Sequence, residues 1–415
     1  MPAMQAGPLQ GLRVVEMGQL IAGPFCGQLL GDMGADVVKI EPPGAGDPMR
    51  AWGRGEFQLW WDIIARNKRS ASIDLRQDAG QDLVRRLISK ADILIENFRP
   101  GTLERWNLDP DVLIQGNPRL IVVRVSGYGQ EGPYSGRAGF GGIGEAMGGW
   151  RHIVGDPDRP PSRMGVSIGD SLAATFGCMG ALAALHHRDQ TGEGQIVDSS
   201  LYEAVLQMME GLLPEYAIAG YVRERTGSVL PGIAPSNVYR CTDGDYLIGA
   251  NQDSVFRRLC SALGQPELAD DPQFATHLQR GRNQTELDGI VEAWTSIRSV
   301  AEVEAAMIEH AIPAGSIFTA REMLEDPHFA ARESIVYVDH PKWGRFPMQN
   351  GFPRMSATPT GFRHLAPQEI GQHTREVLAD IGVGDDELAL LRDAGIVSGP
   401  RNLPLLAEAG LGRKA

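Results

Sequence analysis

The chain has 415 residues, of which 42% are hydrophobic, and this length predicts two domains because single cores rarely grow so large. Its net charge of −13 argues against nucleic acid or an anionic membrane as a partner. No apolar run is long enough to span a membrane, and no basic segment precedes an apolar one near the first residue, so we expect no signal peptide. The four cysteines form no Cys-x-x-Cys pair and are typical of reduced thiols in a cytoplasmic protein.

The first part of the chain alternates apolar strands with helices. Strands are predicted at residues 12–17, 35–41, 71–75, 92–96 and 120–125, with helices over residues 23–33 and 79–90. A strand–helix–strand unit of this length predicts a right-handed crossover between parallel strands. No Gly-x-Gly-x-x-Gly follows the first strand, which argues against a nicotinamide or flavin site there.

Two loops of this part carry chemically interesting residues. The basic cluster at residues 67–70 (NKRS) is either a solvated turn or a phosphate contact, and charge alone does not separate the two. The stretch from residue 126 to Trp150 is rich in glycine and predicts a long binding loop rather than a regular element.

A single carboxylate stands out at residues 163–174 (RMGVSIGDSLAA). Asp170 follows Gly169 and precedes a helix predicted over residues 171–187. It would lie at or near the N-cap of this helix, where backbone N–H groups and the helix dipole favour an anion. This local pattern by itself favours a structural cap over a functional carboxylate. The predicted buried face of the helix consists of Leu172, Phe176, Met179, Leu182 and Leu185.

The remainder of the chain predicts a division into domains. A large domain over residues 1–213, ending in a helix at 201–213, is followed by a linker at 214–232 that is rich in glycine and proline. A smaller α/β domain is predicted over 233–325, with a strand pair and helices at 254–263, 284–297 and 301–310. A second linker at 326–345 then leads back to the large domain over residues 346–415, which include a helix at 372–382.

Several enzyme classes lack their motifs in this chain. The histidines are dispersed, so we predict no metal site, and neither a Gly-x-Ser-x-Gly elbow nor a P-loop is present. What remains is Asp170, with arginines upstream of it. Carboxylates can act as covalent nucleophiles, and arginines can hold phosphates or carboxylates.

The chain resembles the family III CoA-transferases over almost its whole length. The matching stretches are residues 11–16 (GLRVVE), 21–24 (IAGP), 34–41 (GADVVKIE), 67–70 (NKRS), 96–101 (ENFRPG), 127–133 (GYGQEGP), 165–170 (GVSIGD) and 371–374 (GQHT). The resemblance implies a Rossmann-like large domain plus a smaller α/β domain, in ring-shaped subunits that interlock as a homodimer. It also implies that Asp170 is the nucleophile, carrying first an acyl–aspartyl anhydride and then an aspartyl–CoA thioester.

The resemblance implies no permanently bound cofactor, with CoA and acyl-CoA as substrates. The residues to which the family's CoA contacts carry over are Ile21, Ala22, Ile73, Asp74, Leu75, Arg76, Asn97, Phe98, Arg99, Arg105, Arg137 and Phe140. Some relatives place a phosphate-binding arginine where this chain has Pro42, which leaves the phosphates to Arg76, Arg99 and Arg105.

Two alternative functions stay open at this point. A 2-methylacyl-CoA racemase would resemble this chain, but that branch carries a histidine base where this sequence reads Phe140-Gly141. A non-catalytic CoA-binding subunit is the other alternative, and the presence of Asp170 argues against it. The branch that this chain resembles most uses succinyl-CoA and small dicarboxylates, for which Arg137 or Arg163 would bind the distal carboxylate.

Overall fold

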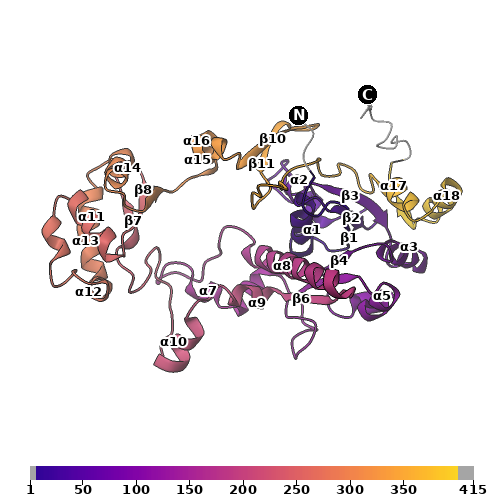
Figure 1. The fold of residues 1–415 in the computed structure, drawn as a ribbon, viewed down its shortest axis with the longest axis horizontal. Coiled ribbons are helices and arrows are strands. Elements are labelled where there is room, and N and C mark those ends of the chain that lie inside the picture. Colours follow the sequence, from indigo (N-terminus) through magenta and orange to yellow (C-terminus); the bar gives the residue numbers. More distant parts are fainter. Residues whose placement is uncertain (1–5, 401–415) are drawn as a thin grey trace. The chain divides into compact units, whose positions relative to one another are not determined.

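A computed structural model describes residues 6–400 of the chain, which divide into two compact units (Figure 1). The larger unit joins the chain up to Trp150 with Met164–Pro214 and with the chain from Glu333 onward. The smaller unit joins Arg151–Arg163 with Glu215–Arg332. Each unit therefore combines stretches that are far apart in the sequence, while the predicted domain boundaries and linkers stay a prediction.

The larger unit is organised around a seven-stranded sheet with the order β12-β3-β2-β1-β4-β5-β6. β12 pairs antiparallel with β3, and the other neighbouring strands pair in parallel. The strands are β1 (Arg13–Glu16), β2 (Asp36–Glu41), β3 (Lys68–Ile73), β4 (Ile93–Glu96), β5 (Ile121–Ser126), β6 (Ile196–Ser200) and β12 (Val397–Ser398). The prediction of a mixed α/β fold with a large, mostly parallel sheet is confirmed.

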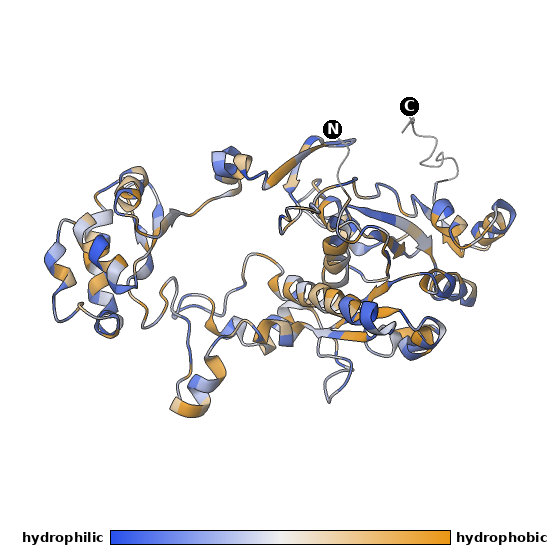
Figure 2. Cartoon of the chain, in the orientation of Figure 1, coloured by the Kyte–Doolittle hydropathy of each residue, from blue (hydrophilic) through white to orange (hydrophobic). Residues whose placement is uncertain are grey.

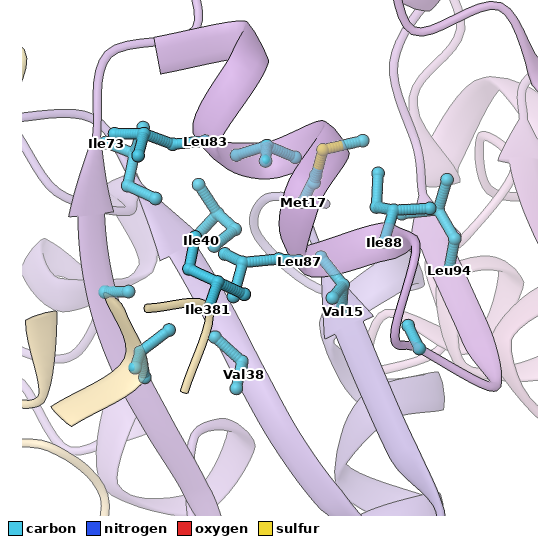
Figure 3. Close-up of a cluster of buried hydrophobic side chains, with 14 of the residues drawn as sticks. Val15, Met17, Val38, Ile40, Ile73, Leu83, Leu87, Ile88, Leu94 and Ile381 are labelled. Atoms are coloured by element: carbon cyan, nitrogen blue, oxygen red, sulfur yellow. The ribbon is translucent and has the colours of Figure 1, made fainter. Parts of the chain in front are cut away.

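Helices cover both faces of this sheet because buried residues alternate along its strands. On one face, Val14, Ile93 and Ile121 pack with α1 (Ala22–Asp32) and α8 (Ile168–Thr191). On the other face, Val15 and Leu94 pack with α3 (Asp78–Ile88), as Figure 3 shows. The second face is completed by α4 (Thr102–Arg105), α5 (Pro110–Gly116), α17 (Thr374–Ala379) and α18 (Asp385–Asp393).

The buried face of α8 agrees with the predicted one except at Met179, because Leu185 is buried while Leu172, Phe176 and Leu182 pack half-buried against the same core. Its fully buried side is a stripe of small residues that includes Ala173, Gly177 and Ala181, whereas Met179 is 57% exposed. A Cβ atom at Gly177 would meet Val123 Cγ1 at 3.1 Å, so small side chains let this helix lie close to the sheet. By length and composition α8 could cross a membrane, but a core helix passes the same test, and α8 packs on strands.

Other local predictions were also wrong. The stretch predicted as a binding loop contains α6 (Gly141–Met147) and the start of α7 (Trp150–Ile153), and the helix predicted at 201–213 is split into α9 (Leu201–Leu206) and α10 (Leu212–Ala219). Lys68 is neither solvated nor free to bind a phosphate, because it is fully buried against Glu16.

The chain after Glu333 adds a hairpin of β10 (Ile335–His340) and β11 (Gly344–Gln349) to the larger unit. Short helices α2 (Trp60–Ile64) and η1 (Pro48–Ala51) complete the larger unit.

The smaller unit contains a three-stranded sheet, β7 (Ser236–Arg240), β8 (Asp245–Gly249) and β9 (Ala314–Ser316), and its own apolar core. Apolar and polar residues share its helices, as Figure 2 shows, which is typical of helices with one buried face. The helices are α11 (Asp253–Ala262), η2 (Pro266–Ala269), α12 (His277–Arg282), α13 (Gln284–Thr295), α14 (Val300–Glu309), α15 (Ala320–Glu325) and α16 (Pro327–Ala331). Both the strand pair and the helices predicted at 254–263, 284–297 and 301–310 are present within a few residues.

Candidate functional site

Asp170 lies in the first turn of α8, where the dipole of a 24-residue helix stabilises a carboxylate. The N-cap residue is Ser167, whose side chain makes no capping hydrogen bond. Glu145 of α6 contributes instead, because its Oε1 accepts a hydrogen bond from Gly169 N at 3.4 Å while the side chain is buried. The predicted position of Asp170 at or near the N-cap was therefore close, and a residue of another helix helps to cap α8.

Asp170 lines a cavity of about 190 Å³ together with residues from several loops. These loops follow β1, β4 and β5, whose carboxyl ends meet at the same edge because the strands are parallel. The cavity is lined by Gln19, Leu20, Ile21, Ala22, Trp52, Asn97, Phe98, Val125, Ser126, Gly127, Gly139, Phe140, Asp170 and Leu201. The structure thus brings Ile21, Ala22, Asn97, Phe98 and Phe140 together with Asp170.

The closest neighbour of the Asp170 carboxylate among the glycines is Gly141, the first residue of α6. A Cβ atom at Gly141 would lie 2.2 Å from Asp170 Oδ2 and 2.7 Å from its Cγ. No side chain other than hydrogen fits there while the carboxylate keeps its position. The sequence interpretation did not single out Gly141 as a contact of Asp170, and the signal that could have found it is the absence of a side chain in the glycine-rich stretch before α6.

Asn97 connects the loops after β4 and β1. Its Oδ1 accepts a hydrogen bond from Gln19 N at 2.7 Å, and its Nδ2 donates to Gln19 O at 2.9 Å. The side chain therefore holds the backbone of Gln19 at both polar groups. This contact explains why Asn97, predicted as a ligand contact, also has a structural role in the cavity wall.

A second cavity of about 360 Å³ shares Gln19 and Phe98 with the first one. It is lined by the predicted residues Ile73, Asp74, Leu75 and Arg76, and by residues that were not predicted, among them Pro43 and Trp106. Phe98 packs edge-on against Trp106, with ring centroids 5.0 Å apart. Two adjoining cavities with a shared wall suit a long ligand that reaches from Arg76 to Asp170.

Asp74 and Arg76 form a close ion pair at the mouth of the second cavity. Arg76 Nε donates to Asp74 Oδ1 at 2.8 Å and Nη2 donates to Oδ2 at 2.9 Å. These hydrogen bonds from Arg76 are the main reason that the pKa of Asp74 falls to about 2. The Arg76 side chain is 75% exposed, so the outer edge of its guanidinium remains accessible to an anion.

The other three predicted arginines do not line either cavity. Arg99 and Arg105 are exposed beyond β4, and Arg105 Nη2 donates to Thr102 Oγ1 at 2.9 Å. Arg137 is exposed and stacks on Tyr134, with its guanidinium carbon 3.6 Å from the ring centroid. Within residues 6–400, no group of three or more histidine, cysteine, aspartate or glutamate side chains is arranged to hold a metal ion.

Comparison with known proteins identifies the group to which this chain belongs. The family model described as CoA-transferase family III matches residues 9–374. The succinyl-CoA–D-citramalate CoA-transferase of Chloroflexus aurantiacus is 55% identical over 94% of this chain and 98% of its own length. The succinate–glutarate CoA-transferase of Agrobacterium fabrum is 36% identical over 90% of this chain and 96% of its own length.

Solved structures agree with this relationship. The crystal structure of a CAIB/BAIF family protein from Brucella suis matches with a TM-score of 0.79 and 34% sequence identity. The match covers 91% of this chain and 100% of that protein. The predicted resemblance is therefore confirmed: the chain belongs to CoA-transferase family III and is a CoA-transferase.

Proposed function

We propose that this CoA-transferase moves CoA from succinyl-CoA to a small dicarboxylate through covalent intermediates on Asp170. The observation that carries the proposal is a half-buried carboxylate in a cavity at the carboxyl ends of parallel strands. Carboxylates act as nucleophiles in covalent catalysis, and this edge of a parallel sheet is where ligands collect.

In the proposed reaction, an Asp170 oxygen attacks the thioester carbonyl of the donor. The new C–O bond gives an acyl–aspartyl anhydride, and the C–S bond breaks to release the CoA thiolate. The thiolate then attacks the Asp170 carbonyl, releasing the donor acid and forming an aspartyl–CoA thioester. The acceptor carboxylate displaces the thiolate from that thioester to form a second anhydride. Attack of the thiolate on the acceptor acyl carbon gives the new acyl-CoA and regenerates Asp170.

The CoA portion of the donor would occupy the second cavity. Apolar walls at Ile73 and Phe98 suit its extended chain, and the exposed edge of Arg76 suits a phosphate. Arg99 and Arg105 stand beyond these walls, so we assign the phosphate contact to Arg76 first. Ile21, Ala22, Asn97 and Phe140 would then surround the thioester end beside Asp170.

The substrate class rests on the relatives. Chains that are 55% and 36% identical are named for succinyl-CoA with D-citramalate and for succinate with glutarate, all of them dicarboxylic acids or their CoA esters. We propose D-citramalate or a similar dicarboxylate as the acceptor. Of the two arginines that the sequence offers for the distal carboxylate, Arg137 and Arg163, we propose Arg137, which follows β5 in the larger unit and stacks on Tyr134 outside the cavity.

We further propose that two ring-shaped subunits interlock as a homodimer. An apolar groove of about 670 Å³ beside α1 and α8 of the larger unit supports this arrangement. It is lined by the exposed side chains of Val166, Met179 and Phe352, which a partner subunit would cover. All four cysteines are free thiols, which supports a cytoplasmic location.

The racemase alternative is disfavoured by the residues around Asp170. Phe140 cannot transfer a proton, and the space at Gly141 is filled by the Asp170 carboxylate. A base would therefore have to come from elsewhere in the chain. The non-catalytic alternative is addressed by the activity experiment.

The test is intact-protein mass spectrometry after incubation with succinyl-CoA, with acyl-CoA products followed in parallel for D-citramalate, malate and glutarate. We expect a CoA or succinyl adduct on Asp170 and one new acyl-CoA product. Asp170→Ala should abolish both the adduct and the product while the melting temperature stays near that of the wild type. Full turnover by this variant would refute the role of Asp170.

A further inference from the structure

Four charged side chains are buried beneath the first cavity without lining it. Glu16, Lys39, Asp47 and Lys68 are each at most 1% exposed. Lys39 Nζ lies 3.1 Å from Glu16 Oε1 and 2.7 Å from Asp47 Oδ2, and Lys68 Nζ lies 2.7 Å from Glu16 Oε2. Two positive and two negative charges thus form one connected network, which we call the buried charge network.

The network binds the backbone of the turn after β1 and of the first residues of α1. Lys39 Nζ donates to Gly18 O, Asp47 Oδ1 accepts from Leu20 N at 3.1 Å, and Lys68 Nζ donates to Pro24 O at 2.6 Å. Residues 19–22 form one wall of the cavity that contains Asp170, and the contacts to Gly18 and Pro24 flank them while the contact to Leu20 lies within them. Hydrogen bonds from the charged side chains of Lys39, Asp47 and Lys68 therefore hold this wall, and such bonds are stronger than those between neutral groups.

The backbone of this turn requires such support. Leu20 has a φ of 62°, a left-handed conformation that is unfavourable for a residue with a side chain. Strained conformations persist only where surrounding contacts hold them, and they are concentrated at functional sites. The hydrogen bond from Leu20 N to Asp47 is one of those contacts, and the Asn97 amide holds the adjacent Gln19.

Stability alone does not explain why these groups are charged. Replacing a buried ion network with apolar residues of similar size is often neutral or stabilising, so a buried network is weak support for a purely structural role. Burial raises the pKa of Asp47, but Lys39 and the backbone N–H groups outweigh burial and lower it, so this carboxylate stays ionised. A permanently charged acceptor fixes the Leu20 N–H in one place.

We infer that Asp47 and Lys39 are positioning residues for transfer: through Leu20 and Gly18 they hold the cavity wall against the ligand that reacts at Asp170. The inference rests on the proposed function of Asp170. It predicts that loosening the network lowers kcat, because reacting atoms displaced by about 1 Å react roughly 100-fold more slowly. Of residues 19–22 only Gln19 also lines the second cavity, so KM for the acyl-CoA should change less than kcat.

The test compares Asp47→Asn and Asp47→Ala with matched variants of Asp92. Like Asp47, Asp92 pairs with a buried cation and accepts a backbone hydrogen bond: Arg188 Nη1 and Arg13 N each donate to it at 2.8 Å. Its side chain is 27% exposed and lies at the opposite ends of the strands. We expect kcat to fall about 10-fold to 100-fold for Asp47→Ala. The kcat of Asp47→Asn should fall less, because asparagine keeps an oxygen that accepts from Leu20 N. The Asp92 variants should keep the wild-type kcat at a similar loss of melting temperature.

Equal kcat losses for the Asp47 and Asp92 variants at matched melting temperatures would overturn the inference. If Asp47→Ala does not fold, Asp47→Asn decides, because it keeps the shape of the side chain and an oxygen for Leu20 N but loses the charge that pairs with Lys39. An unchanged kcat for a folded Asp47→Asn would refute the positioning role. Asp170→Ala is measured in the same assay. Turnover by Asp170→Ala would refute the proposed function. If Asp170→Ala is inactive but the Asp47 variants keep the wild-type kcat, only this inference is refuted.

Discussion

Gly141→Ala is the substitution that most directly tests the arrangement around Asp170. The new Cβ atom would lie 2.2 Å from Asp170 Oδ2, whereas unbonded heavy atoms stay about 3.2 Å or more apart. The carboxylate must therefore move by roughly 1 Å, which is typically enough to slow a positioned reaction about 100-fold. This corresponds to an increase of about 2.7 kcal/mol in the activation free energy.

The same substitution should have little effect on folding. Gly141 is the first residue of α6 and has an ordinary negative φ, so alanine fits the backbone and gains up to about 1 kcal/mol of helix propensity. Turning the Asp170 side chain to relieve the contact costs about 0.5–1.5 kcal/mol, which nearly offsets that gain. We therefore expect the unfolding free energy to change by less than about 1 kcal/mol while kcat falls.

The assay follows new acyl-CoA from succinyl-CoA and D-citramalate, and chemical denaturation gives the unfolding free energy. Gly116→Ala is the matched control, because Gly116 ends α5 and has no atom within 4 Å of an added Cβ. The control should keep the wild-type kcat. A wild-type kcat for Gly141→Ala would show that transfer does not need the Asp170 carboxylate where the structure has it.

Three further predictions concern ligand binding, pH and capping. Arg76→Ala should raise KM for acyl-CoA about 3-fold to 10-fold with little change in kcat, and the effect should shrink at high salt. Burial raises the pKa of Glu96 from 4.5 to about 7 despite its hydrogen bond from Arg124. As the pH rises, Glu96 therefore loses its proton at a lower pH in the unfolded chain than in the folded protein. Stability from Glu96 is therefore present below pH 4.5 and is lost as pH rises to about 7, by about 3 kcal/mol at 1.36 kcal/mol per unit. Ser299→Ala removes the capping box with Glu302 and should cost about 1 kcal/mol in α14, seen as faster amide exchange there.

Each of these predictions has its own control. Arg85→Ala removes an exposed arginine that pairs with Asp82 and should leave KM unchanged, so an equal rise in both variants would exclude a specific contact at Arg76. Glu96→Gln should lose the pH-linked part of the unfolding free energy, and an identical pH dependence in the variant would show that Glu96 does not titrate in this range. Unchanged exchange in α14 after Ser299→Ala would show that the cap is not needed.

Local pattern in the sequence was sufficient for most strands of the large sheet. Continuous apolar runs such as residues 120–125 identify buried strands because both faces of a parallel sheet are covered. The local pattern at Asp170 favoured a structural cap, and only the resemblance along the whole chain pointed to this carboxylate as a nucleophile and to the family. The predicted lining residues Ile21, Asn97 and Phe98 meet at Asp170 because each follows a parallel strand, and such strands place their carboxyl ends together.

Periodicity failed where packing depends on the partner surface. The large residue Met179 was predicted to be buried, but the sheet selects the small residues of α8, because only they allow the close approach that Gly177 makes to Val123. The helices α6 and α10 were missed because glycine and proline in the sequence outweighed the weak helical pattern.

The sequence by itself determined the α/β class, because strand hydrophobicity is a local property, and its resemblance to family III CoA-transferases along almost the whole chain determined which carboxylate is the candidate nucleophile. Only the tertiary structure decided that Lys68 is buried with Glu16 and that Gly141 touches Asp170. It also decided that Arg99 and Arg105 lie outside the cavities. These facts depend on strand order and on the direction in which each loop leaves the sheet, and the atoms that meet are separated by tens of residues along the chain.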